Sequence, residues 1–185
     1  MEFKKLVNSA LNFCVNRFIE IVGLTILICG VLLLISLLSY SPDDPNFIFP
    51  KNNDINNVLG FRGSFVADLF YQSFGFIALL IPFSFIFVGA NIFLNKRLFL
   101  IIETLFYTIS YSIFGSLFFT IFYSNAFILY INGNGGFTGK YLESTFLNTL
   151  VNLRPQFSYY ILVFIIIIFF LISTHFKLST FYKYV

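Results

Sequence analysis

Few side chains in this chain could do chemistry, and they stand apart from one another. His175 is the single histidine, and the two cysteines, Cys14 and Cys29, lie fifteen residues apart in one apolar segment. A disulfide would need a bend there, so we expect free thiols and no metal site built from the usual soft ligands. There is no GxxxxGK[ST] phosphate loop and no polar set for a Ser/His/Asp triad. The sequence therefore predicts no catalytic, cofactor-binding or metal-binding residue, and His175 is expected to lie at a membrane surface rather than to carry protons.

Ionisable side chains at membrane depth would favour transport, because a carboxylate at a helix centre costs about 2.5–3.5 kcal/mol on insertion scales. Only Glu103 and Asp68 come near that depth. Glu103 is close in sequence to Lys96 and Arg97 and lies in the first turns of its helix. Asp68 precedes Gln72 by four residues, so the two share a helix face. For both carboxylates we favour anchoring at the interface or hydrogen bonding between helices over coordination of an ion.

The composition indicates that lipid surrounds most of the chain. Of its 185 residues, 58% are hydrophobic and 10% are charged, and the mean hydropathy is +0.89. Soluble domains carry about 25% charged residues. These values exclude a soluble globular enzyme and a disordered protein. The net charge of +3 is too small to imply direct binding of nucleic acid.

Apolar runs long enough to cross a bilayer predict an all-α integral membrane protein with one domain over residues 1–185. The four expected spans are residues 21–38, 69–94, 98–122 and 157–176, with Pro82 near the centre of the second. Two long structured loops, 40–68 and 123–158, connect the spans on the same side of the membrane. The pattern from Thr138 to Val151 predicts a short amphipathic helix in the second loop, lying at the membrane surface.

The basic residues set the expected orientation. Seven stand on one side of the spans and four in the two long loops. This bias favours both termini in the cytoplasm and both long loops outside. The seven are Lys4, Lys5, Arg17, Lys96, Arg97, Lys177 and Lys183, and the four are Lys51, Arg62, Lys140 and Arg154.

Small residues in the first two spans would allow helices to approach closely in lipid. Gly23 and Gly30 share one face of the first span, since they are seven residues apart. Gly75, Ala78, Pro82 and Gly89 would do the same in the second span. We favour packing inside the four-helix unit over contact between molecules.

A series of motifs follows in a specific order. The stretch LLSYSPDDP closes the first span, NVLGFRGSFVADLFYQSFGFIA leads into the second, and a Gly-Gly-x-x-Gly element precedes the fourth. Together they resemble the N-terminal four-span membrane domain of bacterial DNA translocases of the FtsK/SpoIIIE type, over about residues 23–172. The candidate interaction or structural residues at the matching positions are Ser39, Tyr40, Pro42, Asp44, Pro45, Gly60, Gly63, Asp68, Gly75, Gly135, Gly136 and Gly139.

The resemblance implies an inner-membrane anchor at the division septum that contacts divisome membrane proteins and forms homo-oligomers. The family's cytoplasmic ATPase motor and its DNA-reading module are absent from this sequence, so neither ATP hydrolysis nor direct DNA binding is expected of it. The leading hypothesis is a motorless anchor and scaffold module acting in cell division and chromosome segregation. The alternatives are a small channel or transporter subunit, which would depend on Glu103, Asp68 or Gln72, and a decaying gene fragment without function.

Overall fold

The computed structural model describes residues 2–45, 55–124, 129 and 131–175, and it is helical without strands over these ranges. The predicted end of the fourth span at residue 176 lies outside the described residues, as do Lys51, Lys177 and Lys183. The all-α class is confirmed, and four helical segments are long and apolar enough to cross a membrane. The elements are α1 Glu2–Leu38, α2 Gly60–Phe74, the 3-10 helix η1 Gly75–Leu80, α3 Ile81–Asn95, α4 Leu100–Phe122, α5 Gly136–Glu143, α6 Phe146–Leu153 and α7 Pro155–Ser173.

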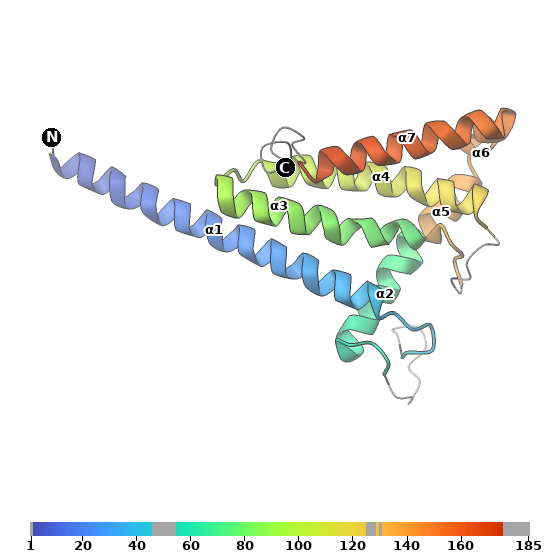
Figure 1. Cartoon of the computed structure of the whole chain (residues 1–185), viewed down its shortest axis with the longest axis horizontal. Coiled ribbons are helices and arrows are strands. Elements are labelled where there is room, and N and C mark those ends of the chain that lie inside the picture. The colour runs from blue at the N-terminus through green and yellow to red at the C-terminus, as the bar shows by residue number, and fades with distance from the viewer. Residues whose placement is uncertain (1, 46–54, 125–128, 130, 176–185) are drawn as a thin grey trace, which may run out of the picture.

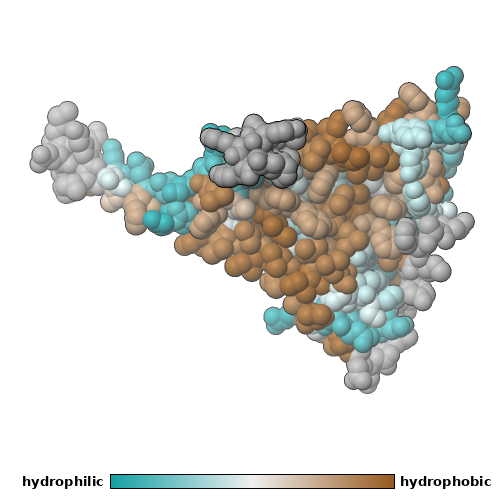
Figure 2. Space-filling view, in the orientation of Figure 1, coloured by the Kyte–Doolittle hydropathy of each residue, from teal (hydrophilic) through white to brown (hydrophobic). Residues whose placement is uncertain are grey.

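The long helices form two packed pairs, α1 with α3 and α4 with α7, and α3 also contacts α4 (Figure 1). One end of the bundle holds the short connection 96–99 between α3 and α4, and we call it the turn end. The other end holds the two long connections, 39–59 and 123–135, together with α5 and α6, and we call it the loop end. An apolar belt covers the helices between these ends, while polar surface gathers at the loop end and along the start of α1 (Figure 2).

The α1–α3 interface depends on glycines. A Cβ atom built on Gly89 would lie 2.5 Å from the backbone nitrogen of Leu27, and one on Gly23 would lie 2.6 Å from that of Phe93. A Cβ on Gly30 would lie 2.9 Å from the backbone nitrogen of Ile86. The two backbones are therefore in contact, and the predicted internal packing of these small residues is confirmed.

The second predicted span, 69–94, lies within a candidate span over Gly60–Asn95, but it is not one regular helix. The helix begins at Gly60, breaks into the 3-10 helix η1 at Gly75, and resumes as α3 at Ile81. Gly75 has φ 71° and ψ −151°, a conformation that ends the α-helix α2. Pro82 lies in the first turn of α3 instead of at a helix centre, where its missing N–H leaves no hydrogen bond unmade.

Helix α1 is much longer than the predicted span 21–38, because it starts at Glu2 and runs for 37 residues. At 1.5 Å per residue it is about 55 Å long, against about 30 Å of hydrocarbon in a bilayer. Glu20 marks where the bundle ends, since its carboxylate pairs with Arg17 and lies 2.9 Å from the Lys96 ammonium just beyond α3. The residues before Arg17 project past α3 at the turn end (Figure 1).

The single amphipathic helix predicted from Thr138 is in fact two helices, α5 and α6. Helix α5 ends at Glu143 and α6 begins at Phe146. Thr145 stands between them in an extended conformation, and its hydroxyl accepts a hydrogen bond from Leu147 N at 3.3 Å. A threonine that caps a new helix cannot continue the previous one.

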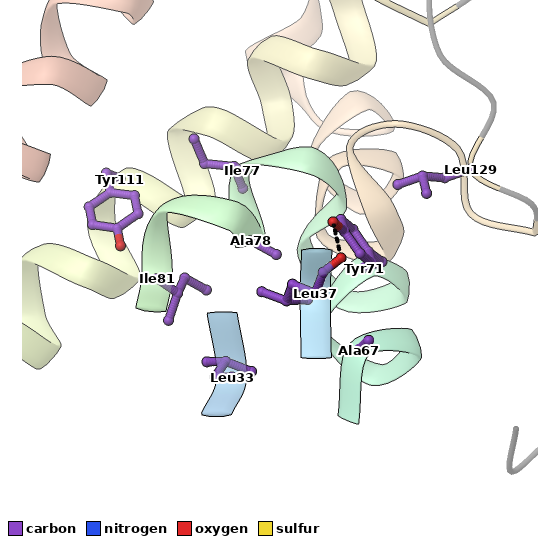
Figure 3. Close-up of a cluster of buried hydrophobic side chains, with 9 residues drawn as sticks. All are labelled: Leu33, Leu37, Ala67, Tyr71, Ile77, Ala78, Ile81, Tyr111 and Leu129. Atoms are coloured by element: carbon purple, nitrogen blue, oxygen red, sulfur yellow. Dashed lines mark hydrogen bonds between the residues drawn. The ribbon is translucent and has the colours of Figure 1, made fainter. Parts of the chain in front are cut away.

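The main apolar core lies where α1, α2, η1 and α4 meet near the loop end (Figure 3). Tyr71 reaches from α2 across this core, and its hydroxyl donates to the Leu37 carbonyl at 3.1 Å. That bond satisfies a carbonyl in the last turn of α1, which has no partner within its own helix. The buried members of the core are Leu33, Leu37, Ala67, Tyr71, Ile77, Ala78, Ile81, Tyr111 and Leu129.

Candidate functional site

Asp44 holds the first long connection at both ends. Its backbone N–H donates to the Ser41 carbonyl at 3.2 Å, which closes a turn beside Pro42. Its buried carboxylate accepts from Asn56 N at 2.8 Å and from Asn57 N at 2.9 Å. Hydrogen bonds to an ionised carboxylate are about twice as strong as neutral ones. Asp44 therefore ties the start of the connection to its end, and neighbouring Asp43 is exposed and takes no part.

Asn57 joins the same connection to the end of α1, with only 4% of its surface exposed. Its amide nitrogen donates to Ser36 O at 2.9 Å and to Ser39 O at 3.3 Å, and its amide oxygen accepts from Leu59 N at 3.0 Å. The Ser36 and Ser39 carbonyls belong to the last turn of α1 and its flank, so the side chain supplies partners that the helix lacks. The sequence prediction missed Asn57, although an asparagine shortly before Gly60 in a segment rich in helix breakers is a turn signal.

Two serine hydroxyls and a glycine complete the contacts between the end of α1, the first long connection and α2. Ser36 donates to Gly63 O at 2.6 Å, and Ser64 donates to Pro45 O at 3.1 Å. A Cβ on Gly63 would lie 2.2 Å from the Asn57 amide oxygen, so only glycine lets α2 pass so close. Gly60 differs, because a Cβ there would meet nothing within 4 Å and only its φ of 65° favours glycine.

Tyr40 and Asp68 form a second contact between the same two segments. The Tyr40 hydroxyl donates to Asp68 Oδ1 at 3.2 Å, and Gln72 Nε2 donates to the same oxygen at 3.4 Å. Burial, followed by the nearby Asp68 charge, raises the pKa of the Tyr40 phenol, so it remains a proton donor at neutral pH. Asp68 and Gln72 thus share a face as predicted, and Asp68 makes hydrogen bonds within the fold.

The second long connection is anchored where α2 meets η1. Asn134 O accepts from Phe76 N at 3.0 Å, and Asn134 Nδ2 donates to Tyr123 O. On the other side of the junction, the Ser116 hydroxyl donates to Phe74 O at 2.9 Å. Asn134 therefore clamps the connection to both α4 and the break in the second span, and it too was missed.

The glycines predicted near this junction come together there. A Cβ on Gly75 would lie 1.9 Å from Asn134 O, and one on Gly136, whose φ is 66°, would lie 2.6 Å from Gly75 N. Gly135 and Gly139 meet α4 instead, where a Cβ on either would fall within about 2.1 Å of the Thr120 hydroxyl oxygen. The four glycines let the start of α5 lie directly against α2 and α4.

Of the twelve candidate residues, ten make the contacts just described, while Pro42 is exposed and Gly60 faces open space. Together with Asn57 and Asn134, the ten form what we call the loop-end cluster. Within the described residues no group of three or more His, Cys, Asp or Glu side chains could hold a metal ion. The arrangement fixes the shape of a surface and offers no reactive group aimed at a cavity.

The turn end has its own polar contacts, which the sequence reasoning paired differently. Lys96 was expected near Glu103 but pairs with Glu20. Glu103 is largely exposed, with its carboxylate 3.9 Å from His175 Nδ1, and His175 Nε2 lies 3.0 Å from the Thr104 hydroxyl. His175 thus lies at the end of α7 in a hydrogen bond between helices, in keeping with the expected structural role.

A row of buried hydroxyls along α4 was also missed. Its four members are spaced four residues apart, which puts them on one helix face. Ser84 of α3 extends the row, because its hydroxyl lies 3.0 Å from the Tyr111 hydroxyl and 2.7 Å from the Ser173 hydroxyl. Small hydroxyl side chains let helices pack closely in lipid and bond across their interface. The spacing was visible in the sequence, and the row consists of Thr104, Thr108, Ser112 and Ser116.

Residues 15–185 match the family described as the 4TM region of DNA translocase FtsK/SpoIIIE. A DNA translocase FtsK of Rickettsia bellii is 29% identical over 143 residues, 76% of this chain and 18% of the relative. The FtsK of Rickettsia typhi is 36% identical over 64 residues, 35% of the chain and 9% of the relative. That of Rickettsia prowazekii is 29% identical over 82 residues, 43% of the chain and 11% of the relative.

These matches cover only a small part of the relatives, since the chain spans less than a fifth of the length of each. No solved structure gives a significant match to the chain. The region shared with the family contains the loop-end cluster and the three later candidate spans whole.

Proposed function

The chain belongs to the family of the four-span membrane region of FtsK/SpoIIIE DNA translocases, and from this premise we propose that it anchors and scaffolds such a translocase in the bacterial inner membrane during cell division and chromosome segregation. The observation that carries the proposal is the match over residues 15–185, which is a match to the membrane region alone. No enzymatic activity is assigned to these residues, because ATP hydrolysis and DNA pumping belong to other parts of a translocase.

The proposed orientation puts the turn end in the cytoplasm and the loop end outside. Arg17, Lys96 and Arg97 lie at the turn end, as basic residues in short cytoplasmic segments do. The loop end carries Arg62, Lys140 and Arg154 together with Asp43, Asp44 and Asp68. Both termini are then cytoplasmic, which would hold any partner on that side close to the membrane.

The loop end also offers an apolar surface for partners. Val58 is 75% exposed and Phe61 is 51% exposed, and Ile55 is exposed beside them. They flank Asn57, whose hydrogen bonds hold this stretch of backbone in place. Neighbouring exposed apolar residues that form a patch mark sites of contact with proteins or membranes. We propose that this Ile55–Phe61 surface contacts membrane proteins of the division machinery.

A channel or transporter subunit is less well supported. That alternative depended on Asp68, Gln72 and Glu103 as polar groups along a path. Asp68 and Gln72 hydrogen-bond within the fold, and Glu103 lies exposed at the turn end.

The experiment is to image a fluorescent protein fused after Val185 in dividing bacteria. A band at midcell is expected for the native sequence. Phe61→Asp should disperse the band while the protein stays in the membrane, because the change places a charge on the proposed contact surface. Phe99→Asp is the control, since Phe99 is also an exposed phenylalanine but lies at the turn end, and it should leave the band intact. An even signal around the envelope for the native sequence would refute the septal role.

A further inference from the structure

Helix α1 carries two apolar seams on opposite faces, and only one of them has a partner. The first packs against the rest of the bundle, chiefly α3, with positions spaced alternately four and three residues apart: Ile19, Gly23, Ile26, Gly30, Leu33 and Leu37. The second has the same spacing, two residues out of register, and we call it the outward seam: Val7, Leu11, Cys14, Phe18, Ile21, Thr25, Ile28 and Leu32. Two residues correspond to about 200° of helix rotation, so the seams face in opposite directions.

Every side chain of the outward seam is exposed in the single chain. Leu11 is 57% exposed, Phe18 63% and Ile21 62%. The seam runs from Val7 to Leu32, which is about 39 Å of helix. Apart from Thr25, whose hydroxyl donates to Ile21 O within the helix, the positions are apolar. A repeat of four and three over more than three heptads is the pattern of helices that pair along their length.

The two seams behave differently where the bundle stops. Beyond the level marked by the Glu20–Lys96 ion pair, the α3-facing seam continues as Asn16, Asn12 and Ser9. That face becomes polar as soon as α3 no longer covers it, as expected of a surface that meets water. The outward seam stays apolar through the same stretch, at Phe18, Cys14, Leu11 and Val7.

Lipid tails can cover the inner half of the outward seam, from Ile21 to Leu32. They cannot cover the outer half as well, because α1 is about 55 Å long against about 30 Å of hydrocarbon, and that half projects past the end of the bundle (Figure 1). A lone helix of this length is marginal in water unless an apolar face is buried. A cover is needed that continues unbroken from the bilayer into the region beyond it.

We propose that α1 of a second copy of this chain covers the outward seam, so that two α1 helices pair in parallel from Val7 to Leu32. Copies inserted in the same direction present their seams at the same depth, which makes the pairing parallel and in register. In the heptad, Leu11, Phe18, Thr25 and Leu32 take the a positions, and Val7, Cys14, Ile21 and Ile28 take the d positions. The two Cys14 side chains then face each other across the pair, whereas Cys29 stands beside the seam. This inference is independent of the septal role.

The native cysteines supply the test. Membranes containing the Cys29→Ser chain, which keeps Cys14, are treated with copper phenanthroline and run without reductant. We expect a band at twice the chain mass of 21.4 kDa, and we expect Cys14→Ser to lose it. Absence of the band from Cys29→Ser membranes would overturn the proposal, and would leave lipid headgroups or a different protein as the cover.

A scan separates specific pairing from random collision. In chains lacking both native cysteines, Leu11→Cys and Phe18→Cys on the seam should cross-link. Asn12→Cys and Phe13→Cys, which are equally exposed and next in sequence but off the seam, should lose the band. Equal cross-linking on and off the seam would contradict a defined pair. Phe18→Asp in the Cys29→Ser chain should also lose the Cys14 band, and its persistence would count against the proposal.

Discussion

Replacing Gly75 with alanine should collapse the junction between the two halves of the loop-end cluster. The backbone at Gly75 has φ 71° and ψ −151°, a region that is essentially restricted to glycine. A Cβ there would also lie 1.9 Å from Asn134 O, which is the atom that accepts the hydrogen bond of Phe76 N. Strain and steric overlap together should cost on the order of 3 kcal/mol or more.

Gly133→Ala is the matched control for this prediction. Gly133 has the same φ of 71°, but a Cβ there would meet nothing within 4 Å. Its cost should be limited to the left-handed backbone, about 1–2 kcal/mol. The readout is the temperature at which a fluorescently tagged chain in detergent loses its monodisperse elution peak. One kcal/mol shifts a midpoint by about 2–4 °C in a chain of this size, so Gly75→Ala should fall well below Gly133→Ala. Equal shifts would show that the Gly75–Asn134 approach is unimportant.

Asp44→Ala should release the first long connection from the end of α1. The change removes the acceptor of both Asn56 N and Asn57 N. Asn57 N is buried, so water cannot replace the lost partner, and the expected cost is about 2–4 kcal/mol. Asn57 would lose its fixed position as well, and with it the contacts to Ser36 and Ser39.

Asp43→Ala removes the same charge one residue away, where the side chain is exposed. It should leave the stability unchanged within about 0.5 kcal/mol. Limited proteolysis of the chain in detergent distinguishes the two variants, because only the Asp44→Ala chain should be cut faster within residues 39–59. Identical cutting of both variants would mean that Asp44 does not hold the connection.

Composition and hydropathy were sufficient to predict four spans, because about 20 apolar residues in a row have few other uses. They could not locate the break at Gly75 or the start of α1 at Glu2. The break depends on Asn134, which approaches from more than fifty residues away and occupies the space that a regular helix would need. The charged residues Arg17 and Glu20 led the sequence prediction to start the first span at Ile21, yet the helix continues before them.

The candidate site was predicted in part for a similar reason. The motif residues from Ser39 to Asp68 were chosen by their order, and the structure brings most of them into one cluster. Asn57 and Asn134 escaped notice because an asparagine in a loop is ordinary until its amide is seen to satisfy carbonyls of distant helices. The role of Glu20 was missed because its partner Lys96 lies far along the sequence, after α2, η1 and α3.

The claim that the loop end faces outward, and the turn end the cytoplasm, underlies the whole proposal. It is tested by two single-cysteine chains that lack both native cysteines, Asp43→Cys at the loop end and Asn95→Cys at the turn end, both at exposed positions. Intact spheroplasts are treated with a maleimide that cannot cross the membrane. The account predicts labelling of Asp43→Cys in intact spheroplasts and of Asn95→Cys only after the membrane is opened. Labelling of Asn95→Cys alone in intact spheroplasts would contradict it.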